Sequence, residues 1–298
     1  MEVGKLEANN FKIAIASGKG GTGKTFLSTS LFSVVSKHYK DVVIVDSDAE
    51  EPNSGIFFDK KLVKEFKVTQ KVPVINTEAC TFCGLCHDYC AYNAIFIIPP
   101  SKIIKVIDEL CHGCGACSYA CKFDALTEKD VEQGIISKFK LNGGETFIES
   151  RMKVGVMSPV KVIKAGLKEA GNKGIVIFDA PPGTSCPFIQ TVTNADYIIL
   201  ITEPTPFGLS DLKQSIDTLK TMNKNYGVVI NRAGLGNDEV YKFLEENKIP
   251  LLMEIPFNRE IAGYYSKAKI AADFMPDLSE SLLKMFDVIL KEYGNSNN

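Results

Sequence analysis

The sequence predicts an α/β fold with a doubly wound, mostly parallel sheet, and three observations support this. Short apolar runs recur along the chain, the segments between them carry apolar residues at helical spacing, and a glycine-rich loop joins the first run to the first helix. Short continuous apolar strands that alternate with helices are typical of a parallel sheet covered on both faces. The alternation stops once, where eight of the nine cysteines gather, which indicates an inserted second domain.

The elements follow in order along the chain. Residues 11–17 are predicted to form a buried strand, residues 24–38 a helix and residues 42–46 a second buried strand. After the interruption we expect strands at 153–157, 175–179, 197–202, 226–230 and 251–255, with helices at about 160–171, 209–222, 238–247 and 278–292. We therefore expect one α/β domain made of residues 1–68 and 128–298, with residues 69–127 as an α+β guest.

Composition limits the partners of the chain. Of its 298 residues 45% are hydrophobic, which suffices for a large core. The 34 basic and 36 acidic residues give a formal net charge of -2, with no basic surface for nucleic acid and no polybasic tether for a membrane. No segment approaches the roughly 18 apolar residues of a spanning helix, and the first residues lack the apolar stretch of a secretory signal. We therefore expect a cytoplasmic protein that binds neither nucleic acid nor membrane.

A glycine-rich loop follows the first predicted strand. Its residues, Gly18-Lys19-Gly20-Gly21-Thr22-Gly23-Lys24-Thr25, satisfy the pattern G-x-x-x-x-G-K-S/T between a strand and a helix. The glycines let successive backbone N–H groups converge on phosphate oxygens, and the N-terminus of the helix adds its positive end. In this setting Lys24 should reach the β- and γ-phosphates, and the Thr25 hydroxyl should bind Mg²⁺. The loop predicts ATP or ADP with Mg²⁺; the alternative is a tight glycine turn without a ligand.

A second lysine, Lys19, gives this loop the pattern Lys-Gly-Gly-x-Gly-Lys-Thr. The pattern resembles the deviant Walker A motif of the MinD/ParA/Mrp superfamily, to which nitrogenase iron protein also belongs. The resemblance spans about residues 1–68 and 128–298. It implies a Mg²⁺-dependent ATPase that forms a homodimer with ATP at the interface, in which Lys19 reaches the nucleotide of the partner subunit and acts in catalysis together with Lys24.

Residues at the ends of later predicted strands extend the resemblance, because open α/β sheets bind ligands at the carboxyl ends of their strands. Asp46-Ser47-Asp48 resembles the family's Asp-x-Asp, and by that likeness Asp46 supports the Mg²⁺ shell while Asp48 polarises or positions the attacking water. Asp179, followed by Ala-Pro-Pro-Gly-Thr, looks like the end of the Walker B strand and would hold Mg²⁺ through water. Asn231 and Arg232 match the family's adenine-reading position less specifically; a plain turn is the alternative.

Two runs of cysteines occupy the interrupting segment. They are Cys80-x-x-Cys83-x-x-Cys86-x-x-x-Cys90 and Cys111-x-x-Cys114-x-x-Cys117-x-x-x-Cys121. This is the spacing of bacterial ferredoxins twice over, and it predicts two 4Fe–4S clusters. A zinc site would instead show two pairs of ligands separated by a longer loop. Because the segment is too short for an apolar core of its own, we expect the clusters to help hold it folded.

The resemblance to two-cluster ferredoxins also implies which cysteines share a cluster, since the fourth cysteine of each run there binds the other cluster. By that likeness one cluster is held by Cys80, Cys83, Cys86 and Cys121, and the second by Cys111, Cys114, Cys117 and Cys90. Gly84 and Gly115 are expected where the backbone passes close to inorganic sulfide. The chain departs from the family where Ala91 and Lys122 replace the usual proline, so cluster potential and solvent access could differ.

The ninth cysteine, Cys186, lies seven residues beyond Asp179. Nitrogenase iron protein has a ligand of its intersubunit cluster in a closely similar place, but it uses a second cysteine per subunit. Every other cysteine here is assigned to the insert, so a bridging four-thiolate cluster is not expected. An inert buried thiol and a two-thiolate or labile site both remain open.

Three functions are compatible with this combination. The one ranked first is an ATP-gated electron carrier that delivers electrons to a partner protein. The second is an iron–sulfur or metallocofactor assembly ATPase like the Mrp-type scaffolds, although these normally have a C-x-x-C pair that this chain lacks in its C-terminal half. The third is a positioning ATPase like MinD. It is ranked last because MinD ends in a basic amphipathic membrane helix, whereas residues 278–292 carry more acidic than basic side chains.

Overall fold

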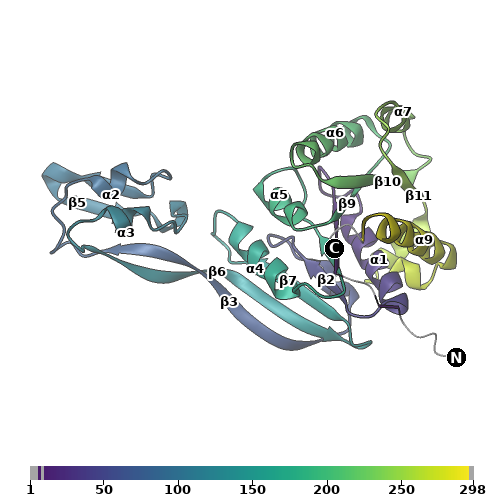
Figure 1. Cartoon of the computed structure of the whole chain (residues 1–298), viewed down its shortest axis with the longest axis horizontal. Coiled ribbons are helices and arrows are strands. Elements are labelled where there is room, and N and C mark those ends of the chain that lie inside the picture. Colours follow the sequence, from purple (N-terminus) through teal and green to yellow (C-terminus); the bar gives the residue numbers. More distant parts are fainter. Residues whose placement is uncertain (1–5, 8–9, 295–298) are drawn as a thin grey trace. The chain divides into compact units, whose positions relative to one another are not determined.

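The computed structural model describes residues 6–7 and 10–294, which divide into two compact units (Figure 1). The host unit comprises the chain up to Glu65, Ile136–Arg151 and the residues from Val162 onward. The cysteine unit comprises Phe66–Ile135 and Met152–Lys161. The guest expected at residues 69–127 lies within the cysteine unit. The unit is longer than that expectation because two strands, β3 (Lys60–Ile75) and β6 (Leu126–Leu141), run unbroken from one unit into the other.

A nine-stranded sheet with the order β11-β10-β9-β1-β8-β2-β7-β6-β3 forms the framework. From β11 to β7 every neighbouring pair is parallel, as the alternation of apolar strands and helices predicts. The bounds of these strands are β1 Phe11–Ala16, β2 Val42–Asp46, β7 Thr146–Met152, β8 Ile175–Asp179, β9 Tyr197–Thr202, β10 Asn225–Ala233 and β11 Leu251–Pro256.

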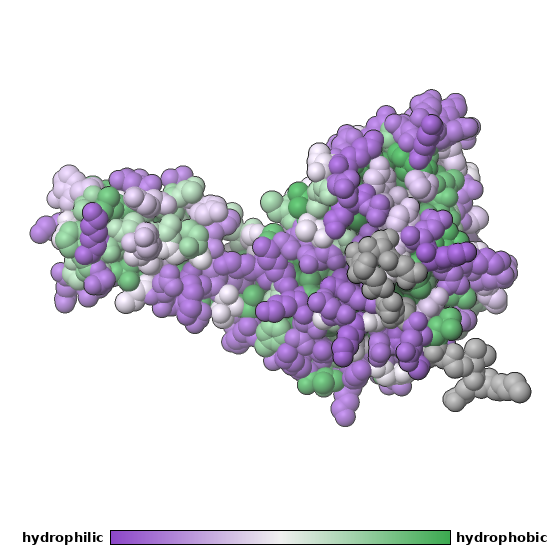
Figure 2. Space-filling view, viewed as in Figure 1, coloured by the Kyte–Doolittle hydropathy of each residue, from purple (hydrophilic) through white to green (hydrophobic). Residues whose placement is uncertain are grey.

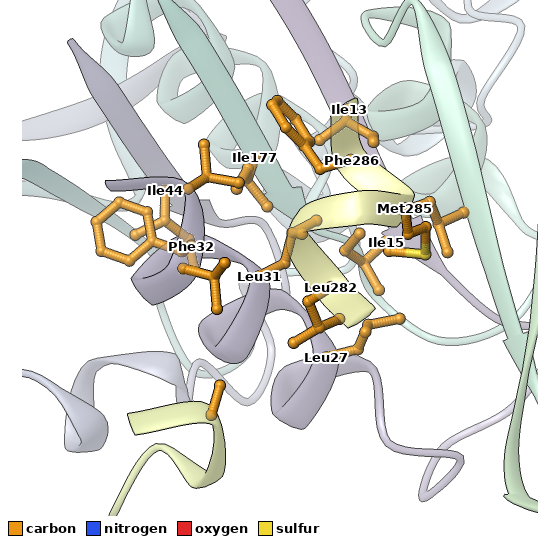
Figure 3. Close-up of a cluster of buried hydrophobic side chains, with 14 of the residues drawn as sticks. Ile13, Ile15, Leu27, Leu31, Phe32, Ile44, Ile177, Leu282, Met285 and Phe286 are labelled. Carbon is orange, nitrogen blue, oxygen red and sulfur yellow. The ribbon is translucent and has the colours of Figure 1, made fainter. Parts of the chain in front are cut away.

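Helices cover both faces of the parallel part. On one face α1 (Lys24–His38) packs with α9 (Pro276–Tyr293), and Figure 3 shows their side chains meeting Ile13 and Ile15 of β1. Successive residues of a strand point to opposite faces, so Ala14 and Ala16 face the other layer. That layer includes α5 (Cys186–Thr193) and α6 (Pro206–Thr221). The remaining helices are α7 Glu239–Glu246 and α8 Arg259–Tyr265 of the host unit and α4 Val160–Ala170, whose first two residues belong to the cysteine unit.

Most of the predicted elements are confirmed, but the strand expected at 153–157 is wrong. That segment is a turn: Gly155 has a φ of 89°, the Val156 N–H bonds to the Lys153 carbonyl, and Val154 is 98% exposed. The strand of this region is β7, five to seven residues earlier, and its polar residues masked it in the sequence. The 16-residue strands β3 and β6 were missed for the same reason, because both are rich in exposed charged side chains.

The cysteine unit repeats itself at a spacing of 31 positions. Helix α2 (Leu85–Asp88) corresponds to α3 (Ala116–Ala120), and left-handed backbone recurs at the pairs Phe82/Gly113, Gly84/Gly115 and Asn93/Asp124. An antiparallel hairpin, β4 (Ile95–Ile98) and β5 (Ile103–Val106), completes the unit. This recurrence in backbone geometry extends the duplication that the two cysteine runs show in the sequence.

The cysteine unit has only a small apolar core, formed by Cys86, Ile95 and Cys117 with Ile104 and Leu126 packed against them. Figure 2 shows apolar side chains exposed among hydrophilic ones on this unit. The exposed large hydrophobic residues of the unit are Val74, Tyr89, Tyr92, Phe96, Ile98, Ile103, Leu110, Tyr119, Phe123, Val154 and Met157. A unit that buries so little apolar surface needs another source of stability, such as a bound group. In the described part of the chain, no helix is both long and apolar enough to cross a membrane.

Candidate nucleotide-binding site and two cysteine cavities

The glycine-rich loop lies between β1 and α1, and its glycines differ in how much space surrounds them. A side chain at Gly18 would collide with the backbone of Asp211, and one at Gly23 would collide with the amide of Asn231. Gly20 and Gly21 instead face open space, with no atom within 4 Å of where a Cβ would stand. The loop is therefore closed against the protein on one side and open on the other, as a phosphate cradle requires.

Lys24 lies inside this loop and is 7% exposed. Its ammonium donates to the Ser17 hydroxyl at 3.1 Å and to the Lys19 carbonyl at 3.2 Å. Burial lowers the pKa of Lys24, and the charges of Asp179 and Asp48 oppose that effect. A buried cation with nearby carboxylates is suited to receive phosphate oxygens together with a divalent metal.

Lys19, the other lysine of the loop, lies at the edge of the cradle. Its ammonium stands 4.0 Å from a carboxylate oxygen of Asp211 on α6, and its side chain is 35% exposed. At that distance and exposure the ion pair is weak, so Lys19 can leave it at little cost. The two lysines of the loop thus occupy different surroundings, one inside the cradle and one at its edge.

Asp46 and Asp179 end the neighbouring strands β2 and β8, in register with each other. Asp46 is fully buried, and both of its carboxylate oxygens accept backbone N–H groups: those of Asp48 at 3.1 Å, Asn53 at 2.9 Å and Ser54 at 2.8 Å. Burial and the neighbouring charge of Asp179 raise the pKa of Asp46 well above its usual range. Asp46 therefore closes the loop of residues 47–54, and the support of a Mg²⁺ shell that the resemblance implied stays a prediction.

Asp179, unlike Asp46, has a carboxylate oxygen that accepts no hydrogen bond from the described residues. Its Oδ2 accepts the Ser54 hydroxyl at 2.7 Å, while its buried Oδ1 has no hydrogen-bond partner among the described residues. Burial raises the pKa of Asp179, against the lowering effects of the nearby Ser54, Thr25 and Ser28 hydroxyls. An unsatisfied buried carboxylate oxygen is costly, and a hydrated Mg²⁺ would satisfy it. The residues therefore fit Mg²⁺ at Asp179 and Thr25.

Two further hydroxyls of this region, those of Thr22 and Ser47, are also buried and have no partner within the part of the chain that the structure describes. Thr22 belongs to the glycine-rich loop and Ser47 follows Asp46. Native proteins satisfy nearly all buried polar atoms. Together with Asp179 Oδ1, these atoms are three polar groups at the carboxyl end of the sheet without a partner among the described residues. A polar ligand at this end would supply their hydrogen bonds.

Asp48, predicted to position the attacking water, lies on the loop that Asp46 closes. Its carboxylate accepts the Glu51 N–H at a long 3.4 Å, and burial raises its pKa to about 6. Lys24 is the cation that acts on it. A carboxylate that is only weakly bonded and has a raised pKa retains the basicity needed to orient water.

The two residues predicted to read adenine, Asn231 and Arg232, have different contacts. The Asn231 amide donates to the Thr22 carbonyl at 2.8 Å, so it braces the glycine-rich loop. Arg232, with a φ of 55°, forms an ion pair of 2.8 Å with Glu203. Sequence reasoning missed Glu203, although it follows a predicted strand directly, where site residues gather. It also missed Asp211 and Ser54, for which the sequence offers no signal.

The eight clustered cysteines line two separate cavities of the cysteine unit. The first cavity is lined by Cys80, Cys83, Cys86 and Cys121, and the second by Cys90, Cys111, Cys114 and Cys117. Each cavity thus combines three cysteines of one run with the fourth of the other, which is the grouping that the ferredoxin resemblance implies. Among the described residues, no three or more His, Cys, Asp or Glu side chains are arranged to hold a single metal ion.

The surroundings of the sulfur atoms fit a cluster. Backbone N–H groups point at three of them: Phe82 N–H at Cys80 (3.4 Å), Ala94 N–H at Cys90 (3.3 Å) and Gly113 N–H at Cys111 (3.3 Å). Gly84 has a φ of 87°, with no atom within 4 Å of where a Cβ would stand. Such N–H···S contacts are among the means by which proteins hold cluster thiolates and adjust their potential.

The two cavities differ in polarity. The first is lined mainly by apolar side chains, among them Ile97, Ile104 and Phe123. The second includes Lys71, His112 and Glu128. Burial raises the pKa of the Cys111 thiol, and the charge of Lys161 lowers it. A group in the second cavity would therefore experience a more polar environment.

The comparison with protein families agrees with the nucleotide site. The CobQ/CobB/MinD/ParA nucleotide binding domain matches residues 13–270. The chain belongs to this family. Proteins similar to this chain include Uncharacterized protein MJ0578 of Methanocaldococcus jannaschii, which is 34% identical over 95% of this chain and 97% of that protein. Uncharacterized ATP-binding protein MJ0169 of the same organism is 24% identical over 93% of this chain and 87% of its own length.

Solved structures of the family show the same fold. The septum site-determining protein MinD of Pyrococcus horikoshii, complexed with Mg-ADP, has a TM-score of 0.58 and 18% identity, covering 94% of this chain and 95% of that one. A complex of a Cyanothece McdA variant with ATP has a TM-score of 0.57 and 16% identity, covering 95% and 97%. At these identities the likeness concerns the fold, so the role of each site residue depends on the geometry of this chain.

Proposed function

We propose that this family member is a Mg²⁺-dependent ATPase that couples nucleotide-dependent dimerisation to electron transfer through two 4Fe–4S clusters in its cysteine unit. One observation carries the proposal: a chain with a phosphate cradle also has two cavities, each lined by four cysteines drawn from both runs. When bound, the clusters would each accept and release one electron. The crossed ligand sets make each half of the unit depend on the other for a complete site.

The chain's own residues would divide the ATPase work as follows. Gly20, Gly21 and Lys24 bind the phosphates, and Thr25 with Asp179 holds Mg²⁺. Asp48 orients the attacking water. Lys19, weakly paired at the edge of the cradle, would cross to the nucleotide of a second copy of the chain in an ATP-bridged homodimer. Its exposure and the weakness of its ion pair with Asp211 support that role.

A second candidate is an iron–sulfur or metallocofactor assembly ATPase, and Cys186 is the observation that favours it. This thiol is exposed and begins α5, shortly after Asp179. A buried inert thiol, one of the two possibilities from the sequence, therefore does not describe Cys186. In this candidate the thiol would hold a cluster or metal in transit, and the acceptor would be a cofactor-requiring protein. A MinD-like positioning ATPase is the third candidate, supported by the fold that this chain shares with MinD.

One experiment separates the first two candidates. Protein purified without oxygen is reduced with dithionite, and EPR spectra are recorded with and without MgATP. The reduced protein is then mixed with an oxidised acceptor protein and, separately, with a cluster-free ferredoxin. An electron carrier becomes oxidised and keeps its iron, whereas an assembly factor transfers iron and sulfide to the cluster-free ferredoxin. Protein that binds no iron under these conditions would refute both candidates and leave the positioning ATPase.

A further inference from the structure

Two buried carboxylates at the carboxyl end of the sheet, those of Asp46 and Asp179, both accept hydrogen bonds from Ser54. Ser54 donates its backbone N–H to Asp46 at 2.8 Å and its hydroxyl to Asp179 at 2.7 Å. Ser54 is fully buried, and both carboxylates are at most 2% exposed. A serine can serve both neighbours because its two donors are separate groups. The strand ends of β2 and β8 are thus joined by hydrogen bonds that do not belong to the sheet.

Ser54 also ends the loop that carries Asp48. The carboxylate of Asp46 holds the two ends of this loop together. It accepts the N–H group of Asp48 near the start of the loop and those of Asn53 and Ser54 at its end. Hydrogen bonds to a charged acceptor are stronger than neutral ones, so the loop is held at both ends from a single point. Asp48 and Ser54 are therefore held by the same carboxylate, one by each of its oxygens.

The residues after Ser54 are packed tightly, which limits how it can move. Ser54 begins the short helix η1 (Ser54–Phe57). A side chain on Gly55 would collide with the ammonium of Lys60 and press on Glu149 and Phe147. Lys60 itself pairs with Glu149 at 3.5 Å and lies 4.9 Å from the centre of the Phe147 ring. A shift of Ser54 would thus move a packed group rather than one side chain.

We propose that Ser54 is a positioning residue, which links the Asp179 carboxylate to the loop of residues 47–54 so that a cation at Asp179 sets the position of Asp48. The inference rests on the proposed ATPase function and adds a residue to it. With the Ser54 hydroxyl on Oδ2, the only oxygen of Asp179 that the described residues leave open is Oδ1, and this oxygen would receive a hydrated Mg²⁺. The hydroxyl orients that oxygen, and through its backbone Ser54 holds the loop at the matching distance.

The test compares Ser54→Ala with Ser30→Ala. Ser30 on α1 is also a fully buried serine, and its hydroxyl has no partner among the described residues, so its variant controls for the loss of a buried hydroxyl. For Ser54→Ala we expect kcat for ATP to fall roughly tenfold, the size of a lost hydrogen bond to a charged group, while the Kd for ADP changes less than about twofold. The Ser30→Ala variant should keep the wild-type kcat.

Amide hydrogen exchange supplies a readout that does not depend on turnover or on the folding of a variant. In the wild-type chain, ADP with Mg²⁺ should slow exchange in residues 47–54 more than ADP with EDTA does. In Ser54→Ala that difference should disappear. Equal exchange in wild-type protein with and without Mg²⁺, or an unchanged kcat in Ser54→Ala, would overturn the inference. A wild-type chain that binds MgADP but hydrolyses no ATP would instead refute the proposed ATPase, and the exchange data would still decide the link.

Discussion

The phenol ring of Tyr92 stacks on the imidazole of His112, with ring centroids 3.8 Å apart and planes 11° from parallel, at the wall of the second cysteine cavity. The equivalent positions of the other half, 31 residues away, are Phe123 and Thr81. The internal duplication therefore does not extend to this stacked pair, which has no counterpart at the first cavity. This difference has a measurable consequence for the clusters that we propose they hold.

We predict that the two clusters have different reduction potentials, with the second cavity holding the one that is easier to reduce. Reduction adds negative charge, which the nearby positive charge of Lys161 stabilises against the opposing charge of Glu128, whereas the apolar walls of the first cavity offer no such charge. Lys161→Met should lower the higher potential by tens of millivolts, since about 1 kcal/mol corresponds to roughly 40 mV for one electron. Redox titration followed by EPR measures both potentials. Lys105→Met, on the exposed side of the hairpin, should change neither, and a single shared potential would contradict the prediction.

The second prediction concerns the crossed ligand sets. Protein prepared without oxygen should contain about eight iron and eight sulfide atoms per chain. Cys90→Ser should damage the cluster whose other ligands are Cys111, Cys114 and Cys117, although Cys90 belongs to the first run. Iron analysis and EPR report the loss, and Cys186→Ser serves as the control that keeps both clusters. Two intact clusters in Cys90→Ser would show that the ligand sets do not cross.

The two loop lysines should give different phenotypes. Lys24→Ala should abolish nucleotide binding, because this ammonium lies inside the cradle. Lys19→Ala should still bind ADP but should lose dimerisation and turnover, since its side chain stands at the edge. Calorimetry measures binding, and sedimentation measures association in the presence of ATP. If Asp48→Ala, which should bind ATP without hydrolysing it, remains wholly monomeric with ATP, the dimer is refuted.

Turnover should depend on pH through Asp48. Burial raises its pKa to about 6, and only the ionised carboxylate can polarise water, so kcat should be near its plateau at pH 7 and fall about tenfold per unit well below pH 6. The raised value also means that the folded state binds more protons than the unfolded state between about pH 4 and 6, so this group makes the fold less stable as the pH rises through that window. Asp48→Asn should remove the acidic limb and most of the remaining activity. An acidic limb that persists in this variant would assign it to another group.

Nucleotide state should reach the clusters if the proposed coupling operates. Coupling free energies between sites are typically about 1–3 kcal/mol, which would shift a one-electron potential by roughly 40–130 mV. ATP, but not ADP, should therefore change a cluster potential or its rate of electron release. Redox titration of Asp48→Ala in the nucleotide-free, ADP and ATP states measures this. Identical potentials and rates in the three states would leave the clusters uncoupled and favour the assembly ATPase.

Much of this protein can be recognised in its sequence because the relevant signals are local. Gly18 to Thr25 fall within one loop, the cysteines of each run lie within eleven residues, and β8 and β9 are continuous apolar runs. Each of these patterns needs only neighbouring residues to be chemically specific. The fold class, the phosphate cradle and the two cysteine runs were therefore open to prediction without a structure, whereas the crossed grouping of the cysteines came from the resemblance to two-cluster ferredoxins.

Only the tertiary structure decided what the isolated acidic and polar residues do. Asp46 matched a metal-site pattern, and only the structure shows that its carboxylate also accepts the N–H groups of Asp48, Asn53 and Ser54. The carboxylate oxygen without a partner among the described residues belongs to Asp179 on the next strand. Asn231 lies 209 positions from Thr22 but braces its carbonyl, and Ser54 reaches an acid 125 positions away. A hydrogen bond depends on distance and direction in space, and residues so far apart acquire these only when the parallel strands bring their ends together.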